Sequence, residues 1–199
     1  MIQKIFSFFK ARRVSGVELG NFRTCDSSNM AFQFRMGAAF PGDVNRTHPA
    51  SIEPCIIDST NPPVLYGQAV MVNPETNTVR GVVPADSTAT GIYGISVRPW
   101  PFQQQTGGMD AAFGISPVAV NQPIDVLKSG YIMVNLSNPT VLPGKGSPVF
   151  VWVAASAGEH TQGDFEAEAT AGSTIALDSK SYFNGTPDAN GYLEIAYNL

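Results

Sequence analysis

Short apolar runs separated by turn residues dominate the chain after Pro63, and their pattern predicts β-strands. The runs are rich in Val, Ile, Tyr, Phe and Trp, and several alternate apolar residues with small or polar ones. No convincing helical pattern lies among them. Many short strands divided by Gly, Pro, Asn and Asp are typical of a sandwich or barrel. The predicted strands are residues 64–72, 78–83, 91–97, 124–134, 149–154, 174–177 and 193–197.

The first third of the chain has a different pattern. Residues 1–13 predict one short amphipathic helix, which either docks onto a protein surface, the simpler interpretation, or lies on a membrane surface. A segment this short needs a partner to hold its helix. From residue 14 to 63, turn residues break the apolar pieces apart, as in the Pro-Gly-Asp turn of residues 40–46.

These patterns together predict an all-β protein, a compact antiparallel β-barrel or sandwich with an extended, loop-rich N-terminal arm. The arm and approach segment are assigned to residues 1–60 and the body to residues 61–199. The length of 199 residues suits one domain plus an arm. The 15 prolines agree, because proline is excluded from helix interiors and tolerated in turns and edge strands.

Charge is scarce and unevenly distributed. Charged residues make up 14% of the chain, against roughly 25% in an average soluble protein, so part of the surface is expected to rest against a partner. Residues 1–48 carry a net charge of +4 and residues 49–199 a net charge of −8. A positive arm on an acidic body predicts docking onto an acidic surface, such as a neighbouring copy or another shell. The overall charge of −4 argues against a general nucleic-acid binder.

The chain has few residues for metal or redox chemistry. Two cysteines, Cys25 and Cys55, and two histidines, His48 and His160, do not supply a zinc site at short spacing. Nothing indicates export, so reduced thiols are favoured over a Cys25–Cys55 bridge. No run approaches the ~20 apolar residues that span a bilayer. We therefore expect a soluble protein made in the cytoplasm, with no cofactor, no metal and no membrane partner.

Three motifs resemble catalytic or binding sites and are interpreted as structural. The Gly/Pro turn around Lys145 lacks the residues of a phosphate loop. Residues 188–191 resemble part of a calcium loop but lack its downstream acid, which favours a turn. Four acids surround His160 in a loop that we interpret as a solvated face, although an acid/base pair or metal site is the alternative. The acids are Glu159, Asp164, Glu166 and Glu168.

The most unusual surface chemistry is the run of residues 98–102, where Trp and Phe stand between prolines at the end of a predicted strand. The run either seals the body, the favoured interpretation, or projects as a contact, since aromatic residues and Arg carry much interface energy. The polar residues 103–112 that follow predict a long surface loop. The candidate contact residues are Phe6, Phe9, Lys10, Arg12, Arg13, Arg98, Trp100 and Phe102.

Several turns and strand ends resemble those of the structural cement proteins of tailed-bacteriophage capsids. The C-terminal sequences Ser-Tyr-Phe-Asn-Gly at 181–185, Asp-Ala-Asn-Gly at 188–191 and Glu-Ile-Ala-Tyr-Asn at 194–198 carry the likeness, together with residues 40–46, 91–99 and 130–134. The resemblance covers most of residues 40–199. It implies a non-enzymatic protein that binds the outside of a phage head and clamps neighbouring major capsid subunits, and it matches no individual binding residue.

We therefore predict a capsid cement protein on the virion exterior, assembled in the host cytoplasm as a symmetric homo-oligomer, a dimer or a trimer. Its expected partners are the major capsid protein and itself. One alternative is a receptor- or glycan-binding module of a phage tail or surface structure, which would use Trp100 and residues 103–112. An enzyme that uses His160 and the nearby acids is the least favoured interpretation.

Overall fold

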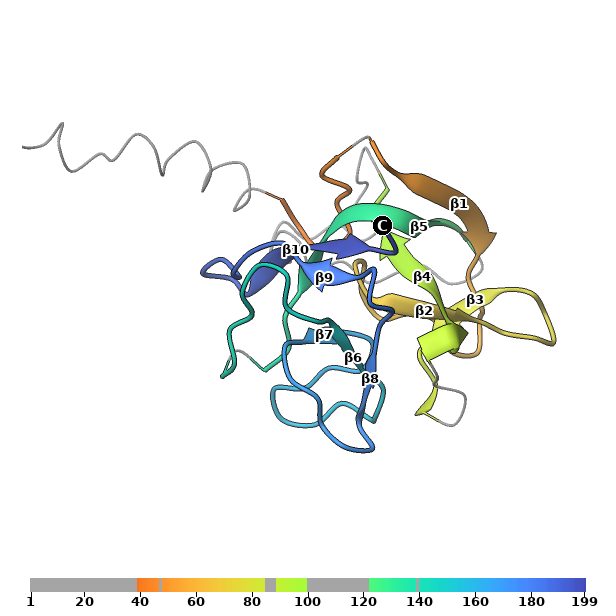
Figure 1. Ribbon diagram of the computed structural model, residues 1–199. Helices are drawn as coiled ribbons and strands as arrows, with labels where there is room; N and C mark the ends of the chain where they lie inside the picture. The colour runs from red at the N-terminus through yellow and green to blue at the C-terminus, as the bar shows by residue number, and fades with distance from the viewer. Residues whose placement is uncertain (1–38, 47, 85–88, 100–121, 139) are drawn as a thin grey trace, which may run out of the picture. The chain divides into compact units, whose positions relative to one another are not determined.

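Antiparallel strands make up the fold. The computed structural model describes residues 39–46, 48–84, 89–99, 122–138 and 140–199 (Figure 1). These residues form two antiparallel sheets and contain no α-helix, only a short 3-10 turn, η2 (Ala89–Gly91). Within this part of the chain, no helix is long and apolar enough to cross a membrane. The predicted all-β antiparallel class is confirmed.

The larger sheet has seven strands. Its order is β3-β2-β4-β5-β10-β9, and β1 pairs additionally with β5 (Figure 1). Every strand pair in it is antiparallel. The strands are β1 (Ser51–Ile56), β2 (Ala69–Val72), β3 (Val79–Gly81), β4 (Ile92–Val97), β5 (Pro123–Asn135), β9 (Tyr182–Phe183) and β10 (Tyr192–Tyr197).

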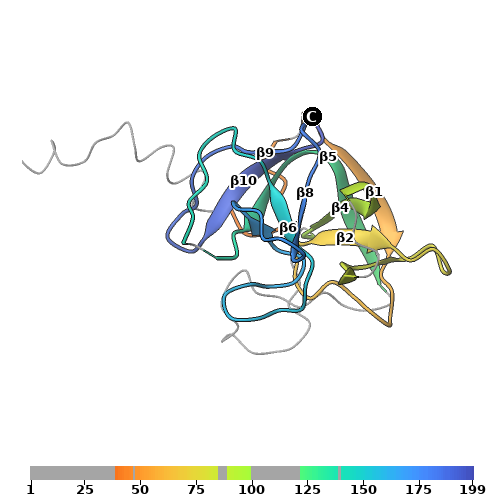
Figure 2. The same ribbon diagram turned by 60° about the horizontal axis from the view of Figure 1, so that its bottom comes forward.

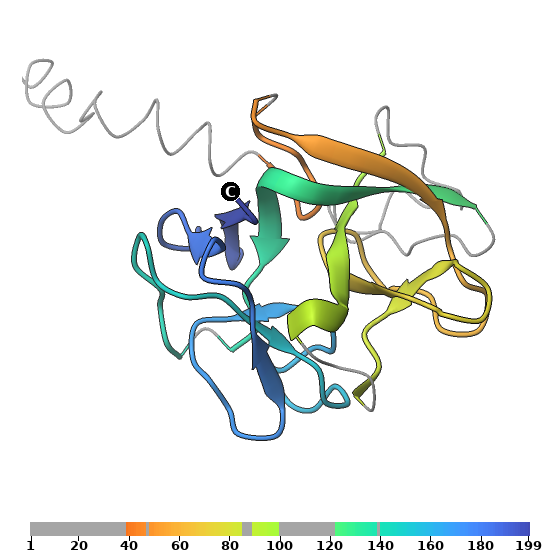
Figure 3. The ribbon, with the colours of Figure 1, turned by 45° about the vertical axis from the view of Figure 1, so that its right-hand side comes forward.

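The long strand β5 organises this sheet by changing partners along its length. Its first half pairs with β1 and β4, and residues 130–135 pair with β10. Gly130 stands at the change with φ of 140°, and a Cβ there would lie 2.9 Å from the carbonyl oxygen of Pro49. Glycine is therefore required at this point, because other residues rarely adopt that φ. Figure 3 shows the resulting sharp bend in β5.

The smaller sheet has the order β7-β6-β8 and packs beside the larger one (Figure 2). One apolar core joins the two sheets. Leu127 and Ile195 from the larger sheet and Val151 and Phe165 from the smaller one are fully buried in it. Each such side chain contributes about 1.5–3 kcal/mol when removed from water. The strands are β6 (Phe150–Trp152), β7 (Phe165–Glu166) and β8 (Thr174–Ala176).

Each of the seven predicted strands overlaps an observed strand, although the predicted run 64–72 becomes a strand only at Ala69. The sequence did not predict β1, β7 or β9. Two of these have only two residues, and β1 is largely exposed with Pro54 in its middle. Residues 39–199 form one compact unit, so β1 belongs to it although the sequence assigned residues 51–56 to the approach segment. The division into an arm at 1–60 and a body at 61–199 stays a prediction.

Candidate functional site

Arg98, at the end of β4, is the one predicted contact residue within the described part of the chain. Its backbone N–H donates to the carbonyl of Gly42 at 2.9 Å, and its guanidinium carbon lies 4.8 Å from the centre of the Phe40 ring. This cation–π contact joins the end of β4 to the start of the described chain. The other candidates, Phe6, Phe9, Lys10, Arg12, Arg13, Trp100 and Phe102, lie outside the described residues and stay predictions.

Two glycines cross next to Arg98. Gly42 has φ of 91° and Gly67 has φ of 79°, and a Cβ on Gly67 would lie 2.6 Å from the backbone nitrogen of Gly42. The turn that carries Gly42 is held by Asp43, whose carboxylate accepts the N–H of Phe40 at 2.8 Å. The tight turn predicted from Pro-Gly-Asp is therefore present. It fixes the first described residues against the end of β4.

A buried carboxylate secures the chain a few residues later. Glu194 of β10 is 3% exposed and accepts hydrogen bonds from Asn45 at 3.3 Å, from Arg46 at 2.8 Å and from Asn184. The Arg46 guanidinium also lies 3.9 Å from the centre of the Tyr131 ring. Charge-assisted bonds of this kind are the strong ones. The segment that follows the turn is thus bound to the central strands β5 and β10.

The acids around His160 are divided between surface and interior. Glu159 and Glu168 are exposed, as a solvated face requires, but Asp164 and Glu166 are each 2% exposed, so the expected solvated face is wrong for these two. The reason is that both have partners. Glu166 lies 2.5 Å from Nδ1 of His160, and the His160 ring stacks on Trp152 at 4.0 Å.

Asp164 connects the two sheets through hydrogen bonds. Its carboxylate accepts from Gln68 at 2.8 Å, from Asn135 at 2.7 Å and from Ser137 at 3.3 Å. Burial raises its pKa, and the three donors only partly offset that effect. Within the described ranges, no three acid, His or Cys side chains gather as a metal site would need. The hydrogen bonds of Asp164 thus join the segment before β7 to β5 and to the segment before β2.

The two other suspected motifs are turns. Lys145 is exposed, and its loop closes through the N–H of Gly144, which donates to Oγ of Ser147 at 3.1 Å. Asp188 accepts the backbone N–H groups of Asn190 at 2.8 Å and of Tyr192 at 2.9 Å. The Ser147 hydroxyl and the Asp188 carboxylate thus accept hydrogen bonds from backbone N–H groups, as Ser and Asp commonly do in turns. Both segments form the turns that the sequence predicted.

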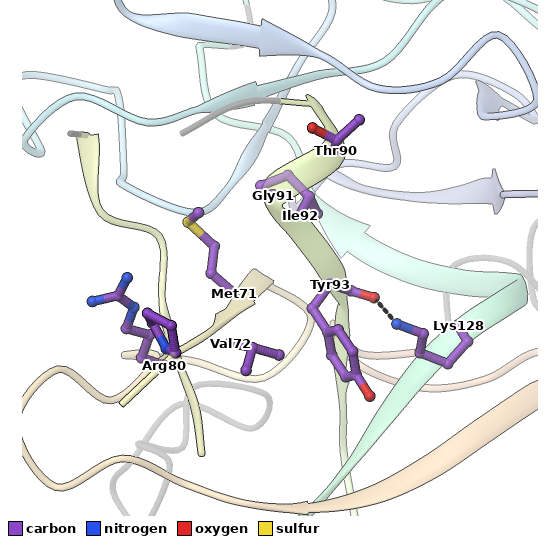
Figure 4. A pocket seen from close by; sticks show the side chains of 9 residues that line it. Met71, Val72, Arg80, Thr90, Gly91, Ile92, Tyr93 and Lys128 are labelled. Carbon is purple, nitrogen blue, oxygen red and sulfur yellow. Dashed lines mark hydrogen bonds between the residues drawn. The ribbon is translucent and has the colours of Figure 1, made fainter. Parts of the chain in front are cut away.

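Two adjoining hollows flank Tyr93, and the sequence did not predict them. One of about 490 Å³ lies between Met71, Arg80 and Lys128 (Figure 4), and one of about 640 Å³ runs along β1. The hydroxyl of Tyr93 donates to Glu53 at 2.6 Å, which raises the tyrosine pKa to about 12. The Lys128 ammonium donates to the Tyr93 carbonyl and lies over its ring. These contacts hold Tyr93 between the two hollows.

The described residues thus form a β-fold with hydrogen-bonded turns and two open surface hollows. Residues 30–197 match the profile of the family described as XM1 gp53 minor capsid protein, and the chain belongs to this family. It is therefore a minor capsid protein, a structural component of a phage head.

A solved structure agrees with the fold. The chain is similar to a chain of the structure described as "The capsid of Myoviridae Phage XM1", with 17% sequence identity and a TM-score of 0.59. The likeness covers 80% of this chain and 90% of that chain. At this identity it shows the fold alone. No curated protein matches the chain.

Proposed function

We propose that the chain is a capsid cement protein that binds the outer surface of the phage head and clamps neighbouring major capsid subunits. Its membership of a minor capsid family carries this proposal. Reinforcement of the contacts between shell subunits is a role that a minor capsid protein can fill without an active site. We further propose that it acts as a symmetric homo-oligomer, since many identical shell sites favour closed symmetry.

The anchoring of the described fold supports a clamping role. A protein that holds two subunits together must carry load from its contact segments into its core without unfolding. Here residues 39–46 are fixed by the crossing of Gly42 and Gly67 and by the Arg46–Glu194 ion pair at 2.8 Å. Both fastenings lead directly to β5 and β10, the centre of the larger sheet.

The test is the heat resistance of shells with and without the protein. Anything that binds only the assembled state stabilises it by RT ln(1 + [L]/Kd), about 2.7 kcal/mol per site at a hundredfold excess over Kd. We expect saturated shells to rupture at a higher temperature than bare shells, and electron microscopy to show added density on the outer face. Identical rupture temperatures at full occupancy would reject the cement role.

A separate measurement addresses the receptor-binding alternative. Binding of the isolated protein to a glycan array, with no effect on shell rupture, would support a receptor-binding module instead.

A further inference from the structure

The sequence Asn-Gly occurs twice in the chain, at residues 184–185 directly after β9 and at residues 190–191 directly before β10. Asparagine is a thermolabile residue, and it reacts most readily where glycine follows, because glycine has no Cβ to hinder attack by its backbone nitrogen on the asparagine side chain. The two sites share this chemistry and differ in their surroundings. A difference in their reactivity in the folded protein is therefore a property of the fold.

The reaction is deamidation, and its only co-reactant is water. The backbone nitrogen of the glycine loses its proton and attacks Cγ of the asparagine. The new N–Cγ bond closes a succinimide ring, the Cγ–Nδ2 bond breaks, and the amide nitrogen leaves as ammonia with that proton. Water then opens the ring at either carbonyl. One opening gives aspartate, and the other gives isoaspartate, in which the backbone runs through the side chain and is one methylene longer.

Asn184 is held back from this reaction by Glu194. Its Nδ2 donates to the Glu194 carboxylate, and its backbone N–H donates to the Glu194 carbonyl at 2.9 Å. Glu194 is 3% exposed and also pairs with Arg46 at 2.8 Å, so the acceptor itself is fixed. Hydrogen bonds to a carboxylate are among the stronger ones. The side chain of Asn184 must leave this partner before its Cγ can meet the nitrogen of Gly185.

Asn190 has no comparable restraint on its side chain. The side chain is exposed, and none of the described residues hydrogen-bonds to its amide. Its backbone N–H donates to the Asp188 carboxylate at 2.8 Å, which closes the turn without covering Cγ. Gly191 has φ of 82° and donates its N–H to the carbonyl of Asp188 at 3.1 Å. That one backbone bond has to open before the glycine nitrogen can attack.

We propose that Asn190 is a site of spontaneous deamidation in the folded protein, whereas Asn184 is protected by Glu194. The exposed turn before β10 supplies an unrestrained asparagine side chain, a glycine nitrogen held by one hydrogen bond, and access for water. The modification requires neither a shell nor a second chain, so it is independent of the proposed capsid role.

The isoaspartate product would act on the first residues of β10. The carbonyl of Gly191 accepts the N–H of Leu136 at 2.9 Å, and Tyr192 pairs with Asn135 of β5. An extra methylene just before Gly191 displaces both groups from their partners. An aspartate at position 190 keeps the backbone length, and its added charge is exposed to water. Loss of stability is therefore expected from isoaspartate and not from aspartate.

Peptide mapping by mass spectrometry of the full-length chain tests the site, during incubation at mildly alkaline pH with and without urea. In the folded protein we expect Asn190 to deamidate at least about tenfold faster than Asn184, because Asn184 reacts only from locally opened molecules. In urea the two rates should become comparable, since glycine follows both residues. Equal rates in the folded protein, a faster reaction at Asn184, or reaction at Asn190 only in urea overturns the proposal.

Thermal unfolding tests the effect on β10. The isoaspartate form, separated from the incubated protein by chromatography, is compared with the recombinant variant Asn190→Asp, which carries the same charge on an unaltered backbone. We expect the isoaspartate form to unfold a few degrees lower, because ladder hydrogen bonds at the start of β10 are lost. Asn190→Asp should unfold close to the fresh wild type. Equal midpoints for the two modified proteins would overturn the assigned effect on β10.

Discussion

Two buried carboxyl groups, those of Glu194 and Asp164, help to hold the described fold together through hydrogen bonds. Glu194 and Asp164 are both nearly inaccessible, and each is satisfied by three donors from segments distant in sequence. Such groups are costly to leave unpaired. Their partners therefore determine how each segment docks.

Removal of the charge on Arg46 should weaken this docking. Arg46→Met keeps an apolar stem over Tyr131 but leaves Glu194 with only amide donors. We expect the free energy of unfolding to fall by about 1–2 kcal/mol, since the arginine side chain is 45% exposed and part of its charge effect is screened. Urea unfolding would measure it. Lys145→Met, at an exposed turn, is the control and should change little; an equal loss in both would contradict the docking role.

Asp164 should impose a distinctive pH dependence. Its pKa is raised in the folded state, so folding favours the protonated carboxyl. Its stability contribution is therefore full below the unfolded pKa of about 3.9 and is lost as pH rises through the folded pKa. We expect the stability of the wild type relative to Asp164→Asn to increase from pH 7 towards pH 4. Parallel stability profiles for the two proteins would show that Asp164 is not perturbed.

At the scale of elements, close backbone crossings position the strands. Gly42 and Gly67 allow the first described turn to lie directly on the segment before β2 and on the end of β4. The contact is between backbones, so no side chain can yield to relieve a clash. The turn, the segment before β2 and the end of β4 can pack this closely only because Gly42 and Gly67 have no Cβ.

Gly67→Ala should therefore be strongly destabilising. The positive φ alone costs about 1–3 kcal/mol, and the 2.6 Å approach to the Gly42 nitrogen adds a backbone clash. Gly146→Ala isolates the first effect, because φ is 87° there and nothing lies within 4 Å of the added Cβ. Thermal unfolding should show a clearly lower midpoint for Gly67→Ala than for Gly146→Ala. Similar midpoints would mean that the crossing relaxes without cost.

The elements also show what the sequence could and could not predict. β4 and β10 were predicted because both are short runs of aliphatic and aromatic residues, and most residues of both are buried. β1 was missed because five of its six residues are exposed and a proline interrupts it, so its sequence shows no alternation of buried and exposed positions. The burial of Glu194 was missed for a different reason. Its donors Asn45 and Arg46 lie about 150 residues earlier, and only the folded chain brings them to it.

At the scale of the whole molecule, residues 1–48 carry a net charge of +4 and the rest a net charge of −8. The affinity for the shell can therefore come from apolar contact and from charge, in unequal shares. Burial of a Phe side chain contributes about 1.5–3 kcal/mol, whereas an exposed ion pair contributes about 0–1 kcal/mol and is weakened by salt. Apolar contact should dominate binding, and charge should set orientation and association rate.

Co-sedimentation with purified shells tests this ranking. Changing Phe6 and Phe9 together to Ser, or deleting residues 1–13, should weaken binding much more than changing Arg12 and Arg13 to Gln, and wild-type binding should survive moderate salt. If the Arg variant fails to bind shells while the Phe variant still binds, charge contributes more to affinity than apolar contact. Normal binding of all three would mean that residues 1–13 are not a docking element.

The change of partners along β5 also bears on how the chain is made. Its two halves pair with β1, about 70 residues earlier, and with β10, about 60 residues later. Such distant pairings are slow to form, because the intervening chain must first be closed into loops. On the ribosome, β5 therefore emerges with one half unpaired, and the larger sheet is completed only after Tyr197 has been synthesised. The nascent chain passes through a stage with an uncovered central strand, which is the stage at which crowding by other copies is most hazardous.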